Sequence, residues 1–572
     1  MALFLEAVMT KKDIIVLLET IATYMELSLE NPFKVSAYRK AAASIEADGR
    51  SLAEIEDFSA IKGIGKGVNE VIVEYRSTGR STVLDDLKSS VPGGLVRMLK
   101  IPTLGPKKIV KIHNELGITG MEELKEACEN KEVSALSGFG AKTEENISKA
   151  IDEILTRPER YPIERIISFR TAVEDVLDDM GTVRKYDVAG SGRRFRETSR
   201  DLDYIIEVTD VAEFTEKFLE SPFIKETVAQ GEKKLSVIIE NDMDEINVDI
   251  RFVTADEYFT TLHHFTGSKD HNVKMRQIAK SRGEKISEYG VETDDGVKTF
   301  DSEAAFFDHF GLPYIPPAMR ETGEETEIDV SGIVSMDDIK GDLHMHTVYS
   351  DGAFSVREMI EACIAKGYEY MIITDHSKSL RVANGLYENK VYKQIEEIKG
   401  LRDEYPEIDI YTGTEMDILK DGTLDYSDDL LAELDYVIAA IHSSFSQTED
   451  EIMHRLRSAC ENPYVRHIAH PTGRLIGSRA GYPVNMSELI SMAKDTGTVL
   501  EVNANPRRLD LSSDVIRHSG LKLTVNTDAH HTGHLEFMNY GVATLQKGLI
   551  QKEAVINTFS RDVFREFVNK GK

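Results

Sequence analysis

The chain has 572 residues, 41% of them hydrophobic, which suffices for several packed domains and excludes a wholly disordered protein. Its three cysteines, Cys128, Cys363 and Cys460, lie far apart, which argues against a disulfide-stapled fold, and no apolar run is long enough to cross a membrane. The apolar start, MALFLEAV, lacks the basic region and cleavage site of a signal peptide. We therefore expect a cytoplasmic protein without a membrane partner.

The net charge of −30 is unevenly distributed along the chain. Residues 1–200 carry a balance of −2, and the remaining residues carry −28. This acidity does not exclude DNA as a partner, because backbone amides, local basic side chains and bound metals also meet phosphates. Eleven of the 16 histidines fall within residues 341–572, a bias that calls for a chemical reason.

Residues 1–157 have helical periodicity, for example in Lys12–Leu27 and Pro32–Ala47, and we divide them into domains at 1–82 and 83–157. A glycine-rich turn recurs three times, with Gly65, Gly105 and Gly140 spaced by 40 and 35 residues. Each turn precedes a helical run whose free amides can hold a phosphate. A single copy is also compatible with a plain packing unit, but three copies resemble helix-hairpin-helix elements, which grip the DNA backbone. The expected DNA contacts are Gly63, Gly65, Lys66, Gly105, Lys107, Gly138 and Gly140.

Residues 158–262 change to strand-like alternation in four runs: Tyr186–Ala189, Tyr204–Val208, Leu235–Glu240 and Ile246–Val253. Asp201 and Asp203 are two residues apart, so in a strand they share one face, and Asp249 lies inside another apolar run. Neighbouring strands would bring the three carboxylates together, a ligand set that suits Mg²⁺. Paired ions can activate a 3′-hydroxyl and stabilise a leaving pyrophosphate. An Asp-x-Asp pair alone is more often a solvated acidic edge.

The order of the motifs favours the metal site. Gly190–Arg194 before Asp201–Ile206, and His264–Ser268 before Asn272, resemble the signatures of family X DNA polymerases, and the resemblance extends over about residues 31–316. It implies an α+β palm at 158–262, a nucleotide-binding, thumb-like subdomain at 263–318, and catalysis by Asp201, Asp203 and Asp249 with Mg²⁺. It further implies contacts to the deoxynucleoside triphosphate from Arg160, Gly190, Ser191, Arg194, Phe265, Thr266, Gly267 and Asn272, and a template contact from Arg276. We expect Arg193 to be a surface charge.

Two positions depart from the family pattern. His264 stands where the family has an aromatic residue before Phe-Thr-Gly-Ser, which leaves discrimination against ribose open. Val71 occupies the position that matches the lyase lysine of DNA polymerase beta, and valine cannot form a Schiff base. We therefore expect no deoxyribose-phosphate lyase activity of that type, and we assign Lys66 to a phosphate contact.

The acidic residues 319–338 predict a linker, and from residue 339 to 572 strand-like runs alternate with helical ones, which predicts a parallel α/β barrel or sheet. The expected strands include Tyr370–Thr374, Ile408–Thr412, Tyr436–Ile441, Thr498–Val502 and Lys522–Asn526. Polar residues follow such runs, and the carboxyl ends of barrel strands converge on one mouth. An isolated histidine there would more often be a core group, but mixed imidazole and carboxylate groups suit Mn, Zn or Fe. The set comprises His344, His346, Asp351, His376, Glu415, His442, His470, Asp528 and His530.

In its order this set resembles the PHP (polymerase and histidinol phosphatase) domain over residues 340–572. The resemblance implies a distorted TIM-like barrel with up to three Mn²⁺ or Zn²⁺ ions. The implied ligands are His344, His346, Glu415 and Asp528 for the first ion, Glu415, His442 and His470 for the second, and Asp351, His376 and His530 for the third. The remaining histidines of this region are expected in surface or supporting roles. Lys378, Arg381, Arg474 and Arg507 are equally compatible with phosphate contacts and with solvated surface charge.

Together, the two halves predict a multidomain, monomeric DNA-templated DNA polymerase joined to a 3′-5′ exonuclease, which fills short gaps in base excision repair. Its substrates would be gapped or primer-template DNA and deoxynucleoside triphosphates. Two other classes stay open. One is a PHP phosphatase whose N-terminal region only tethers it to DNA, and the other is a non-catalytic module that recruits repair partners.

Overall fold

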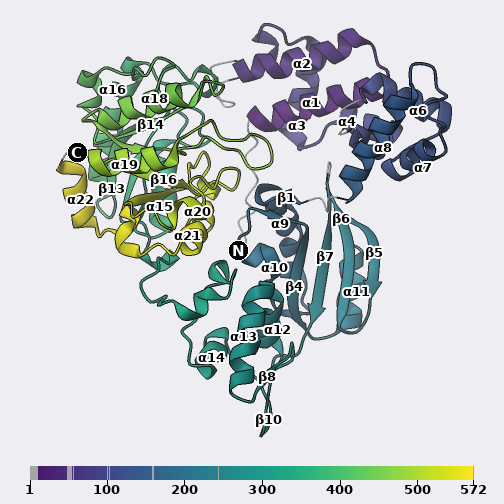
Figure 1. Ribbon diagram of the computed structural model, residues 1–572. Coiled ribbons are helices and arrows are strands. Elements are labelled where there is room, and N and C mark those ends of the chain that lie inside the picture. The colour runs from purple at the N-terminus through teal and green to yellow at the C-terminus, as the bar shows by residue number, and fades with distance from the viewer. Residues whose placement is uncertain are drawn as a thin grey trace. The chain divides into compact units, whose positions relative to one another are not determined.

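A computed structural model describes residues 11–570 except 48–54, 56, 100, 102–103, 157–159 and 242–243 (Figure 1). The chain forms two compact units, one from the N-terminal residues through Glu159 with Leu380–Gly385, and the other from Arg160–Ser379 with Leu386–Lys572. Three predictions fall outside the described residues: the interpretation of the first eight residues, Pro102–Thr103 of the second glycine turn, and the domain boundary at residue 157.

The N-terminal region is helical, as predicted, and each glycine turn leads into a helix. Gly65 and Gly105 are the N-cap residues of α3 and α6 and offer no side-chain cap, and Gly140 directly precedes α8. The region has two apolar cores, one around Leu18 and Ile72 and another around Ile109 and Ile147. The helices are α1 (Lys11–Leu27), α2 (Pro32–Ala47), α3 (Lys66–Thr78), α4 (Thr82–Ser90), α5 (Gly93–Met98), α6 (Pro106–Leu116), α7 (Met121–Glu129) and α8 (Ala141–Thr156), with a 3₁₀ turn at Phe58–Ala60.

The palm is a five-stranded sheet in the order β2-β4-β7-β6-β5, in which β4 runs parallel to β7 and the other neighbours are antiparallel. Apolar side chains of α9 and α11, including Phe169 and Phe214, pack in one core with strand residues such as Tyr204 and Val248. The elements are β1 (Tyr161–Pro162), α9 (Ile163–Asp179), β2 (Val183–Val188), α10 (Gly190–Arg193), β3 (Thr198–Ser199), β4 (Asp201–Val208), α11 (Val211–Leu219), β5 (Ile224–Gln230), β6 (Lys234–Glu240) and β7 (Glu245–Phe252). Each of the four expected strands matches one of these to within three residues.

The thumb packs around Met275 and Phe306. It comprises α12 (Tyr258–Thr266), α13 (Lys269–Ser281), the small sheet β8 (Lys285–Ile286), β9 (Val291–Thr293) and β10 (Gly296–Lys298), and α14 (Glu303–His309).

The structure corrects the expectation of a linker at residues 319–338. This stretch contains 3₁₀ helices, η3 (Pro317–Met319), η4 (Glu324–Glu327) and η5 (Met336–Asp338), and it packs on the thumb. Arg320 is fully buried and its Nη1 lies 2.6 Å from Glu303 Oε1, while Glu325 is hydrogen-bonded to His271 at 2.7 Å. Within the stretch only Glu325 is a buried carboxylate, and the partner of Arg320, Glu303, lies on α14, so the local composition does not reveal this packing.

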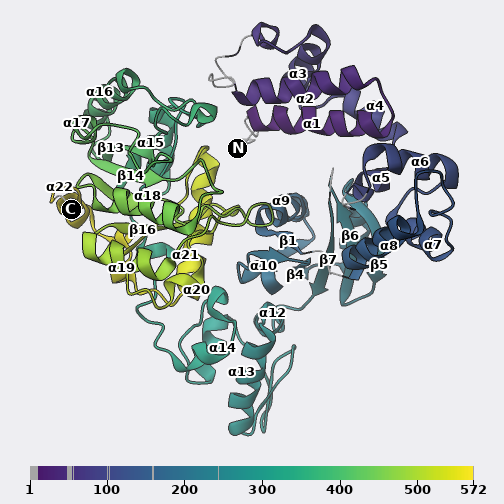
Figure 2. The same ribbon diagram turned by 45° about the horizontal axis from the view of Figure 1, so that its top comes forward.

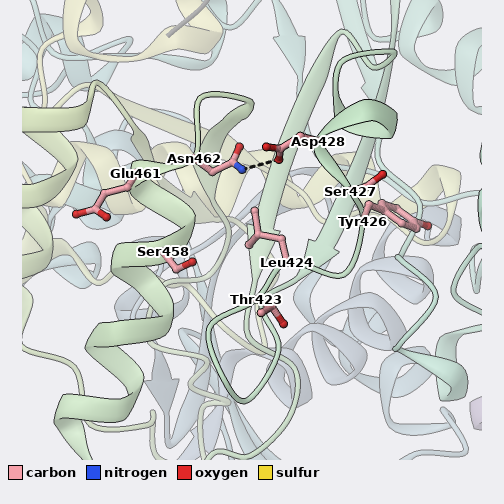
Figure 3. A pocket seen from close by; sticks show the side chains of 8 residues that line it. All are labelled: Thr423, Leu424, Tyr426, Ser427, Asp428, Ser458, Glu461 and Asn462. Carbon is pink, nitrogen blue, oxygen red and sulfur yellow. Dashed lines mark hydrogen bonds between the residues drawn. The ribbon is translucent and has the colours of Figure 1, made fainter.

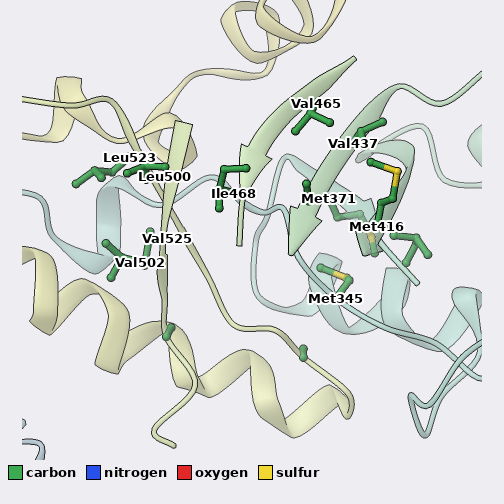
Figure 4. Close-up of a cluster of buried hydrophobic side chains, with 14 of the residues drawn as sticks. Met345, Met371, Met416, Val437, Val465, Ile468, Leu500, Val502, Leu523 and Val525 are labelled. Carbon is green, nitrogen blue, oxygen red and sulfur yellow. The ribbon is translucent and has the colours of Figure 1, made fainter. Parts of the chain in front are cut away.

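The C-terminal domain is a seven-stranded parallel sheet in sequence order, β11 to β17, as predicted for an α/β barrel. A parallel bridge between Met345 and Ala529 joins the segments that follow its first and last strands, so the barrel is nearly closed. Helices surround the strands (Figure 2), and apolar residues of successive strands pack in one buried cluster with apolar residues of these helices (Figure 4). The strands are β11 (Gly341–Asp342), β12 (Tyr370–Ile373), β13 (Asp409–Asp417), β14 (Tyr436–Ala440), β15 (Val465–Ile468), β16 (Val499–Asn503) and β17 (Leu523–Asn526). The helices are α15 (Val356–Ala365), α16 (Glu388–Glu404), α17 (Asp428–Leu431), α18 (Glu449–Glu461), α19 (Met486–Thr496), α20 (Ser513–Ile516), α21 (Met538–Lys547) and α22 (Arg561–Asn569), with 3₁₀ turns η6 (Arg381–Ala383), η7 (Thr532–Phe537), η8 (Lys552–Ala554) and η9 (Ile556–Thr558).

One strand is longer than predicted. β13 extends to Asp417, because it pairs first with β12 and then, from Gly413 onward, with β14. Glu415 therefore lies within a strand and not after one.

Candidate functional site

The three palm carboxylates occupy two adjacent strands. Asp201 begins β4, and Asp203 lies directly opposite Asp249 of the parallel strand β7. Burial, and then the charges of Asp201 and Asp249, raise the pKa of Asp203 to about 7; burial and Asp249 also raise the pKa of Asp201. Mutual repulsion of this kind is what a divalent cation relieves, so the donor set fits Mg²⁺. Asp249 also accepts hydrogen bonds from Ser236 at 2.6 Å and Lys234 at 2.9 Å.

The loop at α10 approaches these carboxylates closely. Gly190 has φ +58°, and a Cβ at this position would lie 2.2 Å from Asp203 Oδ2, so only glycine fits. The predicted triphosphate residues continue from here: the Ser191 hydroxyl is hydrogen-bonded to Ser199, and Arg194 donates to the backbone carbonyl of Thr266. The structure thus places the loop of the first motif against the second motif.

The other predicted nucleotide and template residues lie nearby in the palm and thumb. Arg160 donates to the side chain and backbone of Thr198, at 2.9 and 2.7 Å. The Phe265 ring lies beneath the Arg251 guanidinium, 4.5 Å from its carbon. Gly267 follows α12 with φ +62°; Asn272 of α13 donates to the His264 carbonyl at 2.7 Å, and Arg276 lies on the same helix.

The expectation that Arg193 is a surface charge is wrong. Its side chain is only 15% exposed, and it donates to Glu303 Oε2 at 2.7 Å and to Thr266 Oγ1 at 2.9 Å. The Glu303 carboxylate is shared with Arg320, and the two cations lower the pKa of this buried acid to about 2. Since Glu303 is 110 residues away in sequence, no local pattern identifies it as the partner.

The nine predicted barrel ligands converge at the carboxyl ends of the strands. Groups of three or more of their ligand atoms lie within 4.8 Å of one another. Glu415 is central: its carboxylate oxygens lie 2.8 Å from His470 Nε2, 2.9 Å from His376 Nδ1 and 3.2 Å from His442 Nε2. The groups are His346, Asp351, His376 and His530; His344, His346 and Asp528; and His376, Glu415 and His442.

The donor set of the barrel fits a metal centre. Among the residues that the structure describes, Nε2 of His344, both ring nitrogens of His346 and Oε2 of Glu415 are buried without a hydrogen-bond partner. Buried polar atoms are almost always satisfied, so orphaned nitrogens turned toward carboxylates indicate that cations belong among them. The barrel is therefore a metal site; how its ligands divide among ions stays a prediction.

Two carboxylates that contact the ligating imidazoles were not predicted from the sequence. Glu501 accepts a hydrogen bond from His344 Nδ1 at 2.8 Å, and Asp417 lies 3.2 Å from His442 Nδ1. Such partners fix the tautomer and orientation of a ligating imidazole. The available signal was a charged residue inside an apolar strand, Leu500-Glu501-Val502, which only a buried partner explains.

Replacing Glu501 by Gln is expected to lower the metal affinity of the barrel about 10- to 100-fold, because His344 loses the charge that orients it. The measurement is a Mn²⁺ titration of 3′ degradation of single-stranded DNA by the metal-stripped protein. Glu553→Gln, an exposed carboxylate of the same domain, serves as the control. Identical titration curves for both variants would contradict the role of Glu501.

Several further predicted residues have other partners. Arg474 pairs with Glu197 and Arg507 with Glu164, both in the palm, and Lys378 pairs with Glu388 at 2.5 Å. A surface hollow of about 420 Å³ (Figure 3) contains none of the predicted site residues. Among the described residues, no helix is both long and apolar enough to span a membrane.

Val71 is buried in the first apolar core, within α3, whereas Lys66 stands exposed at the first position of that helix. An apolar, enclosed position does not present a nucleophile to DNA. The absence of the lyase chemistry stays a prediction from the sequence.

Comparisons with known proteins match four separate stretches of the chain and one relative over nearly its whole length. Family models match residues 9–81 (helix-hairpin-helix domain), 95–153 (SAM-like helix-hairpin-helix tandem), 261–321 (DNA polymerase beta thumb) and 342–505 (PHP domain). The DNA polymerase/3′-5′ exonuclease PolX of Bacillus subtilis (strain 168) is 53% identical over 569 residues, covering 98% of this chain and all of that protein. Probable phosphatases of Thermoanaerobacter sp. (strain X514) and Syntrophotalea carbinolica are each 26% identical, over 38% of this chain and about 90% of their own length.

Proposed function

Because the chain belongs to the bacterial PolX family of DNA polymerases with a 3′-5′ exonuclease, we propose that it fills short gaps in DNA at the palm and degrades DNA from the 3′ end at the barrel. The observation that carries this proposal is the presence of two separate clusters of metal-ligand residues in one chain, one of carboxylates and one of imidazoles with carboxylates.

In the palm, Asp201, Asp203 and Asp249 would hold Mg²⁺, which lowers the pKa of the primer 3′-hydroxyl and neutralises the triphosphate. Arg194, Ser191 and Arg160 would bind the triphosphate, for which the fork of a guanidinium is suited. Phe265, Thr266 and Gly267 would line the sugar, and Asn272 would reach the base.

In the barrel, the nine ligands would hold up to three Mn²⁺ or Zn²⁺ ions, which supply a metal-bound water of lowered pKa for hydrolysis. Glu501 and Asp417 would keep the ligating imidazoles oriented. We further propose that the protein works as a monomer in the cytoplasm, in base excision repair.

The experiment is a gap-filling assay with a one-nucleotide gap and varied Mg²⁺ and Mn²⁺, together with metal analysis of the purified protein. Extension by one nucleotide in Mg²⁺, and 3′ degradation in Mn²⁺, are expected. A protein that binds the gap but neither extends nor degrades it would instead be a recruitment module.

The similarity of the barrel to probable phosphatases favours one second candidate, a phosphatase tethered to DNA by the N-terminal region. The two candidates differ at the palm. A tethered phosphatase hydrolyses a phosphomonoester but incorporates no nucleotide under any metal.

DNA binding by the glycine turns is expected to depend steeply on salt, because amides and lysines act on phosphates and release counterions. Affinity for gapped DNA should fall about 10²- to 10³-fold between about 50 and 200 mM salt, measured by fluorescence anisotropy. The double variant Lys66→Ala/Lys107→Ala should show a shallower slope, whereas Lys399→Ala on α16 of the barrel should not. An affinity insensitive to salt would contradict the assignment.

A further inference from the structure

Within the second compact unit, the barrel contacts the palm through ion pairs and hydrogen bonds. Arg474, in the loop after β15, holds Glu197 with two guanidinium nitrogens, at 2.7 and 3.4 Å. Arg507 Nε lies 3.2 Å from Glu164 Oε1. In Figures 1 and 2 the loop after β15 extends toward β1 and α9 of the palm. The contact therefore joins the hydrolytic domain to one edge of the synthetic one.

A third link is made by α21. Lys547, at the end of this helix, donates a hydrogen bond to the backbone carbonyl of Phe195, and the Phe195 ring meets Tyr540 edge-on with centroids 5.3 Å apart. Phe195 has φ +51°, in the left-handed region that disfavours residues with a Cβ. Such a conformation persists only where neighbouring groups hold it in place. One of these groups is the Lys547 side chain, and its burial lowers its pKa to about 8.

Each palm residue of this contact lies within four positions of an arginine predicted to bind the triphosphate. Phe195 directly follows Arg194, and Glu197 is three positions beyond it. Pro162 follows Arg160 by two residues and is covered by the barrel loop, since a Cβ at Gly477 would lie 2.6 Å from Pro162 Cγ. The barrel thus contacts both segments that carry the arginines predicted to bind phosphate.

We propose that Lys547 is a positioning residue of the polymerase reaction, which holds the Gly190–Glu197 loop of the palm in its triphosphate-binding conformation from the other domain. The inference rests on the proposed function and adds that the nucleotide site is incomplete without the barrel. Because the loop would contact the triphosphate before phosphoryl transfer as well as during it, we expect the support to act on nucleotide affinity and not on the chemical step.

A substitution at Lys547 tests this role without disturbing hydrolysis, whereas a substitution at Arg474 does not. Arg474 donates to the Arg508 carbonyl at 2.9 Å, and the Arg508 guanidinium lies 3.5 Å from Asp528, one of the predicted ligands. A change at Arg474 would therefore disturb both domains, whereas Lys547 donates its hydrogen bond to the palm.

The test is single-nucleotide gap filling by the full chain with Lys547→Met, which keeps the aliphatic stem and removes the donor. We expect KM for the incoming deoxynucleoside triphosphate to rise about 3- to 10-fold with kcat nearly unchanged. 3′ degradation in Mn²⁺ should equal that of the wild type. Lys547→Arg restores a donor and should return KM toward the wild-type value. Lys552→Met, which removes a lysine of the same domain paired with Asp338, should change neither constant.

A KM for Lys547→Met equal to that of the wild type would overturn the inference, and so would a fall in kcat alone. If thermal unfolding shows that Lys547→Met does not fold, Glu197→Gln, which loosens the same loop from the palm side, decides the question: the same rise in KM supports the inference and an unchanged KM overturns it. Absence of gap filling by the wild-type protein would instead refute the proposed function.

Discussion

Asn in place of Asp203 is expected to abolish nucleotide incorporation into gapped DNA, lowering kcat by about three orders of magnitude, while 3′ degradation continues. The physical reason is the geometry of the palm. Asp203 lies opposite Asp249 and two residues from Asp201 on a buried sheet, so the amide removes one third of the charge that would hold Mg²⁺. The measurement is single-turnover gap filling in Mg²⁺.

The unfolding temperature of Asp203→Asn distinguishes a loss of catalysis from a loss of folding. Burial and the neighbouring carboxylates raise the pKa of Asp203 to about 7, above its value in an unfolded chain. A carboxyl with a raised pKa destabilises the folded state once the pH exceeds the unfolded value, and the cost is complete above about pH 7. In metal-free buffer at pH 8, the variant should unfold at a temperature no lower than the wild type. Glu226→Gln, on the exposed part of β5, should retain full activity. Equal extension by Asp203→Asn and the wild type would end the assignment of the palm.

The second large effect is expected at Glu415 in the barrel. Glu415→Gln should reduce 3′ degradation about 10³-fold and lower the metal content of the purified protein, with gap filling in Mg²⁺ preserved. Four histidines, His344, His376, His442 and His470, lie within 3.4 Å of this one carboxylate, so its charge is shared by adjacent ligand groups. Measurements are the decay of a 5′-labelled single strand in Mn²⁺ and elemental analysis.

The matched control in the barrel is Glu433→Gln, an exposed carboxylate that no ligand contacts in the described part of the chain. It should leave both activities intact. Undiminished degradation by Glu415→Gln would show that hydrolysis occurs elsewhere. Loss of gap filling as well would show that the two sites do not act independently.

The sequence alone predicted those site residues that lie close to one another along the chain. Asp201 and Asp203 are two residues apart on β4, so their sharing of one face follows from the two-residue period of a strand. His344 and His346 follow β11 and flank the bridged residue Met345 with the same spacing. The glycine turns could also be predicted from the local sequence, because a turn followed by a helix needs no distant partner. Family resemblance added the order of the motifs, and from that the joint presence of synthesis and hydrolysis.

Only the tertiary structure showed which partners the charged residues outside the motifs have. Arg193, expected at the surface, is buried against Glu303, and the acidic stretch 319–338 is packed and not a linker. Glu501 lies 157 residues from the His344 it orients, and Lys547 lies 352 residues from the Phe195 it holds. A charge is stable out of water only beside a specific partner, and chain folding alone determines which distant residue that partner is.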